Sequence, residues 1–421
     1  MNGAIEEIHK ALCQDNAATV RELLKRHPEL KARINEPIEG TGGAVVTHAR
    51  SREMLDVLLE AGADIDAKTR WWAGGFGLLH TASPELAAYA IERGATVDVH
   101  AAARLGRMDR LKELISMDQA LVNARGGDGQ TPLHFAATVE VAEFLLNHGA
   151  ELEARDIDHE STPAQYMVRD RQEVLRFLIQ RGSQTDLLMA AALGDAGLVR
   201  QHLDADPDSI RLRVSDEWFP MVGGKCGGTI YQWALGWHVS AHQVARKFGH
   251  ESIYQLLMEC SPDEVKLIAA CWLGDEALVN SLLAGQPNLA GRLRASERRQ
   301  LAHAARNNNT APMRLMLAAG LPVDACSQHG ATPLHWAAWH GNSEMVRLLL
   351  LRHPPLEQTD ADFNGTPLRW AIHGSENSWD PQSGDYAATV RALLEAGAQP
   401  PDKLAGTDVV RELLRNRGVQ E

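Results

Sequence analysis

The sequence has little of the cysteine and long apolar stretches that mark several classes of protein. Its 421 residues include five cysteines, which are widely spaced and form no CxxC pair. This pattern excludes a disulfide framework and favours a reducing compartment. No apolar run approaches the ~20 residues that a membrane-spanning helix needs. The first residues, MNGAIEEIHKAL, are acidic where a secretory signal would be basic. We therefore expect a cytoplasmic protein without a membrane partner.

Positive charge is also scarce. The chain has 42 Lys and Arg residues against 55 Asp and Glu residues, which gives a formal net charge of −13. An acidic surface repels phosphate backbones unless basic residues are segregated on one face, and no basic run is long enough for that. We expect no nucleic-acid partner.

Motifs of catalysis and phosphate binding are missing as well. Neither GxSxG nor HExxH occurs, and the glycine-rich segment 223–228 (GGKCGG) has no Lys-Ser/Thr at the spacing of a phosphate-binding loop. We therefore expect no cofactor and assign no catalytic residue. Because function lives in sites rather than in folds, an enzyme or a small-molecule binder stays the alternative.

What the sequence does contain is a repeated motif. Residues 131–137 (TPLHFAA) match residues 332–338 (TPLHWAA), and residues 366–371 (TPLRWA) are a third copy. Each copy precedes an amphipathic stretch with paired leucines, and a Gly-Ala ends two of these stretches, at 143–150 and 391–398. These motifs resemble the ankyrin repeat, a unit of about 33 residues with two antiparallel helices and a returning loop. The returning segment 119–125 resembles those of bacterial ankyrin proteins.

The resemblance implies an all-α ankyrin-repeat solenoid over residues 1–421, with about twelve helix-turn-helix units and β-turn fingers. Thr caps the first helix of a unit, and Pro occupies a position where no helical N–H bond is lost. The paired alanines allow neighbouring helices to approach closely, and the leucines fill the core between units. One unit cannot bury its apolar face alone, so neighbouring units must stack. We expect residues 1–40 to form an N-terminal capping unit and residues 403–421 a C-terminal cap helix.

Three insertions depart from the repeat. Two are finger loops rich in Gly and Trp, at 70–77 and 214–237, and the third is a polar loop at 374–385. The alternation of residues 230–235 favours a β-hairpin in the second insertion. The alternative register makes Thr229 the start of a repeat helix, by analogy with Thr366. Several units are also short between their helices, for example after Leu133, and we expect their first helices to be trimmed.

The 18 histidines raise the question of a metal site. His80, His134 and His335 occupy the motif's own histidine position, where the resemblance implies hydrogen bonds within the turn. His238 and His242 are four residues apart, with Cys226 upstream, but this spacing is not diagnostic of zinc. We predict structural histidines and no metal site.

Tryptophan is concentrated where the chain departs from the repeat. Trp336, Trp370 and Phe135 follow the motif histidine or its equivalent and are expected in the core. Other aromatic residues lie on the inserted fingers or at variable first-helix positions, which line the concave face of an ankyrin stack. The candidate binding residues are Trp71, Trp72, Phe76, Arg104, Trp218, Phe219, Trp237, His238, Trp272, Trp339 and His340.

These candidates lead to a functional hypothesis. We expect a monomeric scaffold that binds a protein or peptide through its concave groove and its aromatic fingers. In the alternative, the inserted loops form an aromatic-lined pocket for a small molecule or a substrate. A further possibility is that the same aromatic residues pack internally and fill gaps left by the trimmed units.

Overall fold

The computed structural model describes residues 2–36 and 43–420, so residues 1, 37–40 and 421 of the two predicted caps lie outside the described residues. Within this part of the chain, the regular structure consists of α-helices and short 3-10 helices (η), with no β-strand. The fold is therefore all-α, as predicted. Contacts divide the chain into two compact units, Met1–Leu193 with Val214–Trp237 and Gly194–Arg213 with His238–Glu421. We call them the N-terminal unit and the C-terminal unit.

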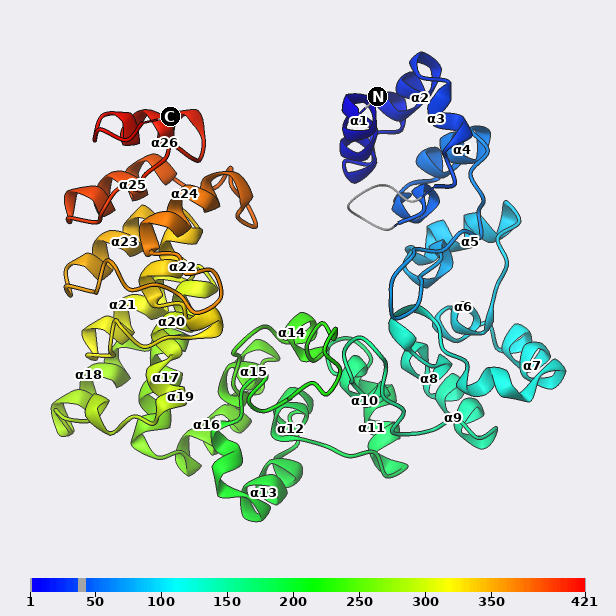
Figure 1. Ribbon diagram of the computed structural model, residues 1–421. Coiled ribbons are helices and arrows are strands. Elements are labelled where there is room, and N and C mark those ends of the chain that lie inside the picture. Colours follow the sequence, from blue (N-terminus) through cyan, green and yellow to red (C-terminus); the bar gives the residue numbers. More distant parts are fainter. Residues whose placement is uncertain (1, 37–42, 421) are drawn as a thin grey trace. The chain divides into compact units, whose positions relative to one another are not determined.

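The N-terminal unit contains a row of first helices and a row of second helices (Figure 1). Neighbouring members of the first row pack on one another, as η2 does on α6, α6 on α8 and α8 on α10. Its elements are α1 (Asn2–Cys13), α2 (Ala17–Arg26), α3 (Glu29–Ala32), η1 (Val45–His48), α4 (Arg52–Glu60), η2 (Leu78–His80), α5 (Pro84–Glu92), α6 (Val99–Arg104), α7 (Met108–Met117), η3 (Gln119–Asn123), η4 (Gly127–Gly129), α8 (Pro132–Phe135), α9 (Val139–Asn147), α10 (Pro163–Met167), α11 (Gln172–Gln180), α12 (Leu187–Leu193) and α14 (Tyr231–Ala234).

The C-terminal unit repeats the arrangement more regularly. Helices α20, α22 and α24 pack in one row, and α21, α23 and α25 pack in a second row beside it (Figure 1). The elements are α13 (Ala196–Ala205), η5 (Pro207–Arg211), α15 (Ala241–Lys247), α16 (Glu251–Cys260), α17 (Asp263–Leu273), α18 (Glu276–Gly285), η6 (Ala290–Arg292), α19 (Ala295–Arg298), α20 (Gln300–Arg306), α21 (Thr310–Ala318), η7 (Gln328–Gly330), α22 (Pro333–Trp339), α23 (Ser343–Leu350), α24 (Pro367–Asn377), α25 (Tyr386–Glu395) and α26 (Asp408–Arg415).

The repeat at α22 and α23 shows how the recurring residues produce the fold. Thr332 is the N-cap of α22 and Pro333 occupies its first turn. Ala337 and Ala338 are fully buried, which permits the close approach of α20 and α24 on either side. Leu349 of α23 is also fully buried and belongs to a core shared with the neighbouring pairs. Each helix pair thus hides its apolar face on the next pair, as stacking repeats must.

Trimmed units have shortened first helices. In place of a two-turn helix such as α22, the first elements of three units are single turns, namely η1, η2 and α8. The polar insertion predicted at 374–385 is helical over its first four residues, because α24 continues to Asn377.

The hairpin predicted within 229–238 is wrong, because residues 231–234 form the helix α14 and Thr229 is buried. The amides of Trp233 and Ala234 donate to the carbonyl of Ile230. The apolar residues Ile230, Tyr231, Ala234 and Leu235 recur at a helical spacing, so burying them on one side favours a helix over the alternation that indicated strands. The alternative register, in which a repeat helix begins near Thr229, is the one that the structure adopts.

No described helix is both long enough and apolar enough to cross a membrane.

Candidate functional site

The motif histidines hold the turns together, as predicted. The Nδ1 atom of His335 accepts from the Thr332 amide at 3.2 Å, and its Nε2–H donates to the Gly365 carbonyl of the next repeat at 3.0 Å. His134 makes the equivalent bonds to Thr131 and Ser161. Burial lowers the pKa of His134 to about 3. Both ring nitrogens of His335 and His134 are occupied by these hydrogen bonds, so we assign both imidazoles a structural role.

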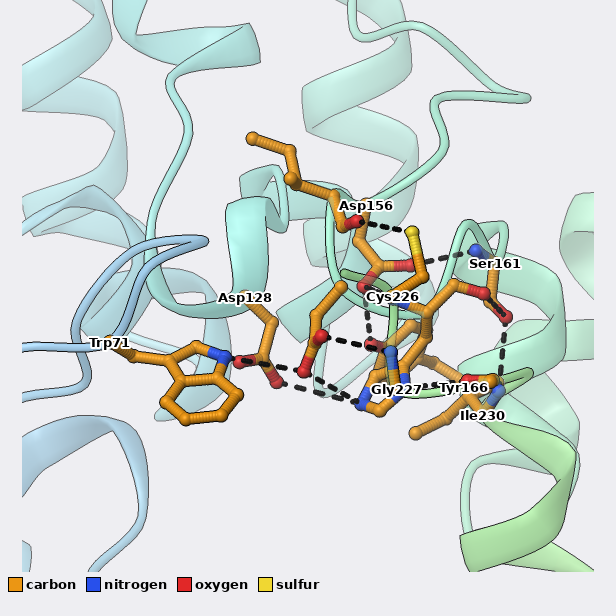
Figure 2. Close-up of polar contacts among 12 residues, drawn as sticks. Trp71, Asp128, Asp156, Ser161, Tyr166, Cys226, Gly227 and Ile230 are labelled. Atoms are coloured by element: carbon orange, nitrogen blue, oxygen red, sulfur yellow. Dashed lines mark hydrogen bonds and ion pairs between the residues drawn. The ribbon is translucent and has the colours of Figure 1, made fainter. Parts of the chain in front are cut away.

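The two finger insertions meet at one buried carboxylate in the N-terminal unit. Asp158 Oδ2 accepts a hydrogen bond from the indole Nε1–H of Trp71 at 3.2 Å. The amide of Gly227 donates to Asp158 Oδ1 at 3.1 Å and to the Asp158 carbonyl at 2.8 Å. Figure 2 shows Trp71 approaching from the left and Gly227 from the right. Asp158 thus joins residues 71 and 227, which belong to different insertions.

Neighbouring finger turns surround this carboxylate. The amides of Ile157 and Asp158 both donate to the carbonyl of Asp128, which lies one repeat earlier. His159 Nδ1 is 2.8 Å from the carbonyl oxygen of Gly228. Asp156 accepts from the amides of His159 and Ser161 and therefore fixes the turn between them.

The same region is acidic and partly desolvated. Burial raises the pKa of Asp128 to about 6, and the neighbouring Asp158 and Asp156 carboxylates also raise it, against the opposing effect of His159. Glu160 accepts from the amides of Val222 and Gly223 and from the thiol of Cys226. Burial and the Glu160 carboxylate raise the pKa of Cys226, so this thiol is not activated as a nucleophile.

The second insertion also walls a pocket of about 430 Å³ in the N-terminal unit. Trp218, Phe219 and Met221 line it on the side of the insertion, and Thr162 and Gln165 of the α10 repeat line it on the other. Phe219 packs edge-on against Tyr231, with ring centroids 5.2 Å apart. The two predicted candidates Trp218 and Phe219 therefore belong to the same pocket.

The C-terminal unit contains a second pocket, of about 420 Å³, which we call the tryptophan pocket. It is formed by α22, α24, the finger turns before them and the segment that follows α24. The residues that line it are His329, Trp336, Trp339, Phe363, Gly365, Arg369, Trp370, His373 and Trp379.

Aromatic contacts hold the walls of the tryptophan pocket together. Trp370 packs edge-on against Trp336, Trp339 and Phe363, with ring centroids 5.1, 6.0 and 6.2 Å apart. Trp336 and Trp370 are buried, as predicted for core residues, whereas Trp379 is 60% exposed and Phe363 is 68% exposed. The pocket thus has a fixed aromatic floor and an exposed aromatic rim.

Cationic groups lie beside this rim. The guanidinium of Arg306 is 5.5 Å from the ring centre of Trp336 and 5.3 Å from that of Trp379. Arg369 lines the pocket and its side chain makes no ion pair among the described residues. The Asp360 carboxylate accepts from the indole of Trp370 and from three backbone amides, and it makes no ion pair with either arginine among the described residues.

Of the four predicted first-helix candidates, Trp339 lines the tryptophan pocket, His340 lies beside its rim, and two make other contacts. Trp339 lines the pocket, and His340 packs against Trp379 at 5.2 Å while its Nε2–H donates to the Arg306 carbonyl. Trp272 is buried and donates to Gln300. Arg104 donates to two carbonyls of the preceding repeat.

The remaining candidates are distributed over several places. Phe76 packs against His80 and Phe135, Trp72 is exposed, and Trp237 is half-buried. His238 stacks on His303 with ring centroids 3.3 Å apart. His242, which the sequence places near His238, is fully buried and bonds to Ser261 instead.

Asp128, His159, His329 and Phe363 were not predicted from the sequence, although all four share one position in the repeat. Each stands three residues before the Thr that opens a repeat helix, at the tip of a finger turn. Tips of successive repeats are neighbours, so Asp128 faces His159, and His329 lies 5.5 Å from Phe363. An alignment of the finger turns of successive repeats, in addition to their helices, would have paired these residues.

Comparison with known families agrees with this architecture. The family model for ankyrin repeats (three copies) matches residues 99–188 and 267–364. The chain is an ankyrin-repeat protein. The first match runs from the start of α6 to the first two residues of α12 and includes the finger tips of Asp128 and His159. The second begins within α17, includes α18 to α23 and ends at residue 364, so it includes the finger tips of His329 and Phe363.

Curated relatives share only segments with this ankyrin-repeat protein. The E3 ubiquitin-protein ligase XB3 of Oryza sativa is 38% identical over 89 residues, which is 21% of this chain and 20% of the ligase. The palmitoyltransferase akr1 of Schizosaccharomyces pombe is 40% identical over 65 residues, 15% of this chain and 10% of that protein. The mouse ankyrin repeat and SAM domain-containing protein 6 is 27% identical over 122 residues, 28% of this chain and 14% of that protein. The match thus spans a fifth or less of each of these relatives.

Proposed function

We propose that this ankyrin-repeat protein is a binding scaffold whose tryptophan pocket receives an apolar side chain of a protein partner. Ankyrin repeats generally bind protein partners, which supports a role in protein–protein interaction. The observation that carries the finer proposal is the exposed pair Trp379 and Phe363 above a buried aromatic floor. Large rings that are held rigid beside a pocket are typical of interface hot spots.

The rim restricts the chemistry of the partner. A cationic anchor is disfavoured because Arg306 and Arg369 already place two guanidinium groups at the rim. An apolar anchor, such as Leu, Phe or Trp, matches the aromatic lining, and acidic residues next to that anchor match the arginines. The proposed ligand is therefore a peptide segment with one large apolar residue and flanking Asp or Glu.

Selection from a random peptide library tests this proposal. Peptides enriched on the wild-type protein are expected to carry an apolar anchor with acidic neighbours. Trp379→Ala should weaken their binding by about 30-fold, which corresponds to the loss of a hot spot of ~2 kcal/mol. Trp233→Ala, which changes an exposed tryptophan of the N-terminal unit that lines neither pocket, serves as the matched control. Equal binding by wild type and Trp379→Ala would refute the proposed role of the pocket.

The pocket beside Trp218 supports a second candidate function. It combines apolar walls from the insertion with the polar side chains of Thr162 and Gln165, a mixture that suits small organic ligands. In this alternative the N-terminal unit binds a small molecule. A thermal-shift screen of metabolites on wild type and Trp218→Ala distinguishes it, because a ligand of this pocket should stabilise only the wild type.

A further inference from the structure

Three side chains in the N-terminal unit are arranged as metal ligands. One oxygen of Asp128, one oxygen of Asp158 and one ring nitrogen of His159 all lie within 4.8 Å of one another. His159 Nε2 is 3.8 Å from Asp128 Oδ2 and 3.9 Å from Asp158 Oδ2. Both distances are too long for hydrogen bonds. Ligand atoms that each lie ~2.0–2.2 Å from one zinc ion stand roughly 3–4 Å apart, and both distances from His159 Nε2 to the carboxylates fall in this range.

The imidazole of His159 is prepared for this role. Its Nδ1 lies 2.8 Å from the carbonyl oxygen of Gly228. Because a carbonyl only accepts, Nδ1 carries the proton, and Nε2, which faces the two carboxylates, is the ring atom that would coordinate a metal. The side chain is nine-tenths buried, so the ring is held in this orientation. A backbone carbonyl that fixes the tautomer of a histidine ligand is the usual outer partner in metal sites.

Hydrogen bonds also orient the carboxylate of Asp158 and fix the backbone of Asp128. Asp158 Oδ2 accepts from Trp71 Nε1 and Oδ1 accepts from the amide of Gly227, and these two bonds fix the plane of the carboxylate. The second lone pair of Oδ2 stays available for a metal. Asp128 is held by its own backbone, whose carbonyl accepts from the amides of Ile157 and Asp158. Each ligand thus comes from a finger turn whose position is set by other contacts.

We propose that Asp128, Asp158 and His159 bind a divalent first-row transition-metal ion, with Zn²⁺ as the best-matched cation. One imidazole and two carboxylates suit Zn²⁺ better than Mg²⁺ or Ca²⁺, which take oxygen ligands. The ion would link the finger turns of two successive repeats, and through Trp71 and Gly227 it would also stiffen both insertions. This site is independent of the tryptophan pocket and of its partner.

Zinc titration of the full chain by isothermal calorimetry tests the proposal. After metals are removed with a chelator, the wild type is expected to bind one Zn²⁺ ion. Asp128→Asn and Asp158→Asn should each bind this ion about 10- to 100-fold more weakly. Asp128→Asn is the primary variant, because it keeps the size of the side chain and leaves the backbone contacts of residue 128 in place. Its melting curve without metal verifies that it is folded.

Two further variants separate a built site from adventitious binding. Asp362→Asn is the matched control, because Asp362 pairs with His329 at 2.6 Å on another finger tip. This variant should bind zinc like the wild type. Trp71→Phe removes the indole donor to Asp158 and should weaken binding by roughly 10-fold, as loss of an outer-shell partner does. Zinc binding that is equal in wild type, Asp128→Asn and Asp158→Asn, or absent from the wild type, overturns the proposal.

Discussion

At the scale of single residues, the motif histidine contributes to stability through two directed hydrogen bonds. His335 is fully buried and connects the amide of Thr332 with the carbonyl of Gly365, one repeat further along. In another repeat Gln165 occupies this position, and its Oε1 accepts from the amide of Thr162 at 2.9 Å. The cap bond therefore requires an acceptor at this position rather than an imidazole as such.

His335→Ala is expected to lower the free energy of unfolding by about 3 kcal/mol, because it leaves a cavity and two buried groups without partners. His335→Gln should cost only about 1 kcal/mol, because the cap bond seen at Gln165 can form again. Urea unfolding of both variants measures the difference. Equal losses for Ala and Gln would mean that the volume of the ring, rather than its hydrogen bonds, matters at this position.

At the scale of elements, the contact between the turn before α15 and helix α20 depends on two stacked histidines. His238 and His303 lie 3.3 Å apart, ring to ring. Burial lowers the pKa of both rings, that of His303 to about 3, and the nearby Arg213, Arg299 and Arg306 lower them further. The folded state therefore excludes protons that the unfolded chain takes up below its ordinary histidine pKa of about 6.5.

This contact should make the protein less stable in acid. The pKa of His303 in the folded protein lies below its pKa in the unfolded chain. The free energy of unfolding is therefore unaffected by this group above pH ~6.5. It decreases by about 1.4 kcal/mol per pH unit as the pH falls from there toward 3. Chemical unfolding between pH 5 and pH 7.5 measures the slope. His303→Gln should flatten it, whereas His148→Gln, which changes an exposed histidine, should not. An unchanged slope in His303→Gln would show that other groups govern acid sensitivity.

The sequence predicts most of the helices of this fold but not the contacts between segments that are distant in the sequence. The TPLH motifs and paired leucines locate helices such as α22 and α23, because capping and amphipathic spacing are local properties. Residues 230–235 were misassigned, because a short apolar segment suits either a strand or one face of a helix until its burial is known. The approach of Trp71 and Gly227 to Asp158 was not predictable either, since contacts over 87 and 69 residues leave no local pattern.

Some residues of the candidate sites could be predicted from the local sequence, and others could not. Trp339 and Trp218, which line the two pockets, were candidates from the sequence, because large aromatic residues at variable or inserted positions stand out against a repeat. Trp379 lies in the insertion at 374–385, which was expected to be a polar loop, so its place on the rim of the tryptophan pocket was missed. Asp128 and His159 look like ordinary polar loop residues until the finger tips of successive repeats are paired.

At the scale of the whole molecule, stability in a repeat protein is the sum of terms within repeats and between nearest neighbours. A defect in one repeat should then spread to adjacent repeats and fade with distance along the chain. Leu349 of α23 and Leu145 of α9 are fully buried and lie in different units. They offer matched sites for the same substitution.

Leu349→Ala is expected to cost about 2–5 kcal/mol locally, because it opens a cavity between helix pairs. Hydrogen exchange followed by mass spectrometry should show faster exchange in α21 to α25 and unchanged exchange in α6 to α9, because the repeats between them absorb the defect. Leu145→Ala should produce the mirror image. If either substitution accelerates exchange equally in both units, the chain unfolds as one cooperative body, and nearest-neighbour coupling does not describe it. Local effects would instead mean that the tryptophan pocket and the Asp128–His159 cluster can be altered one at a time, so that variants in one unit serve as controls for the other.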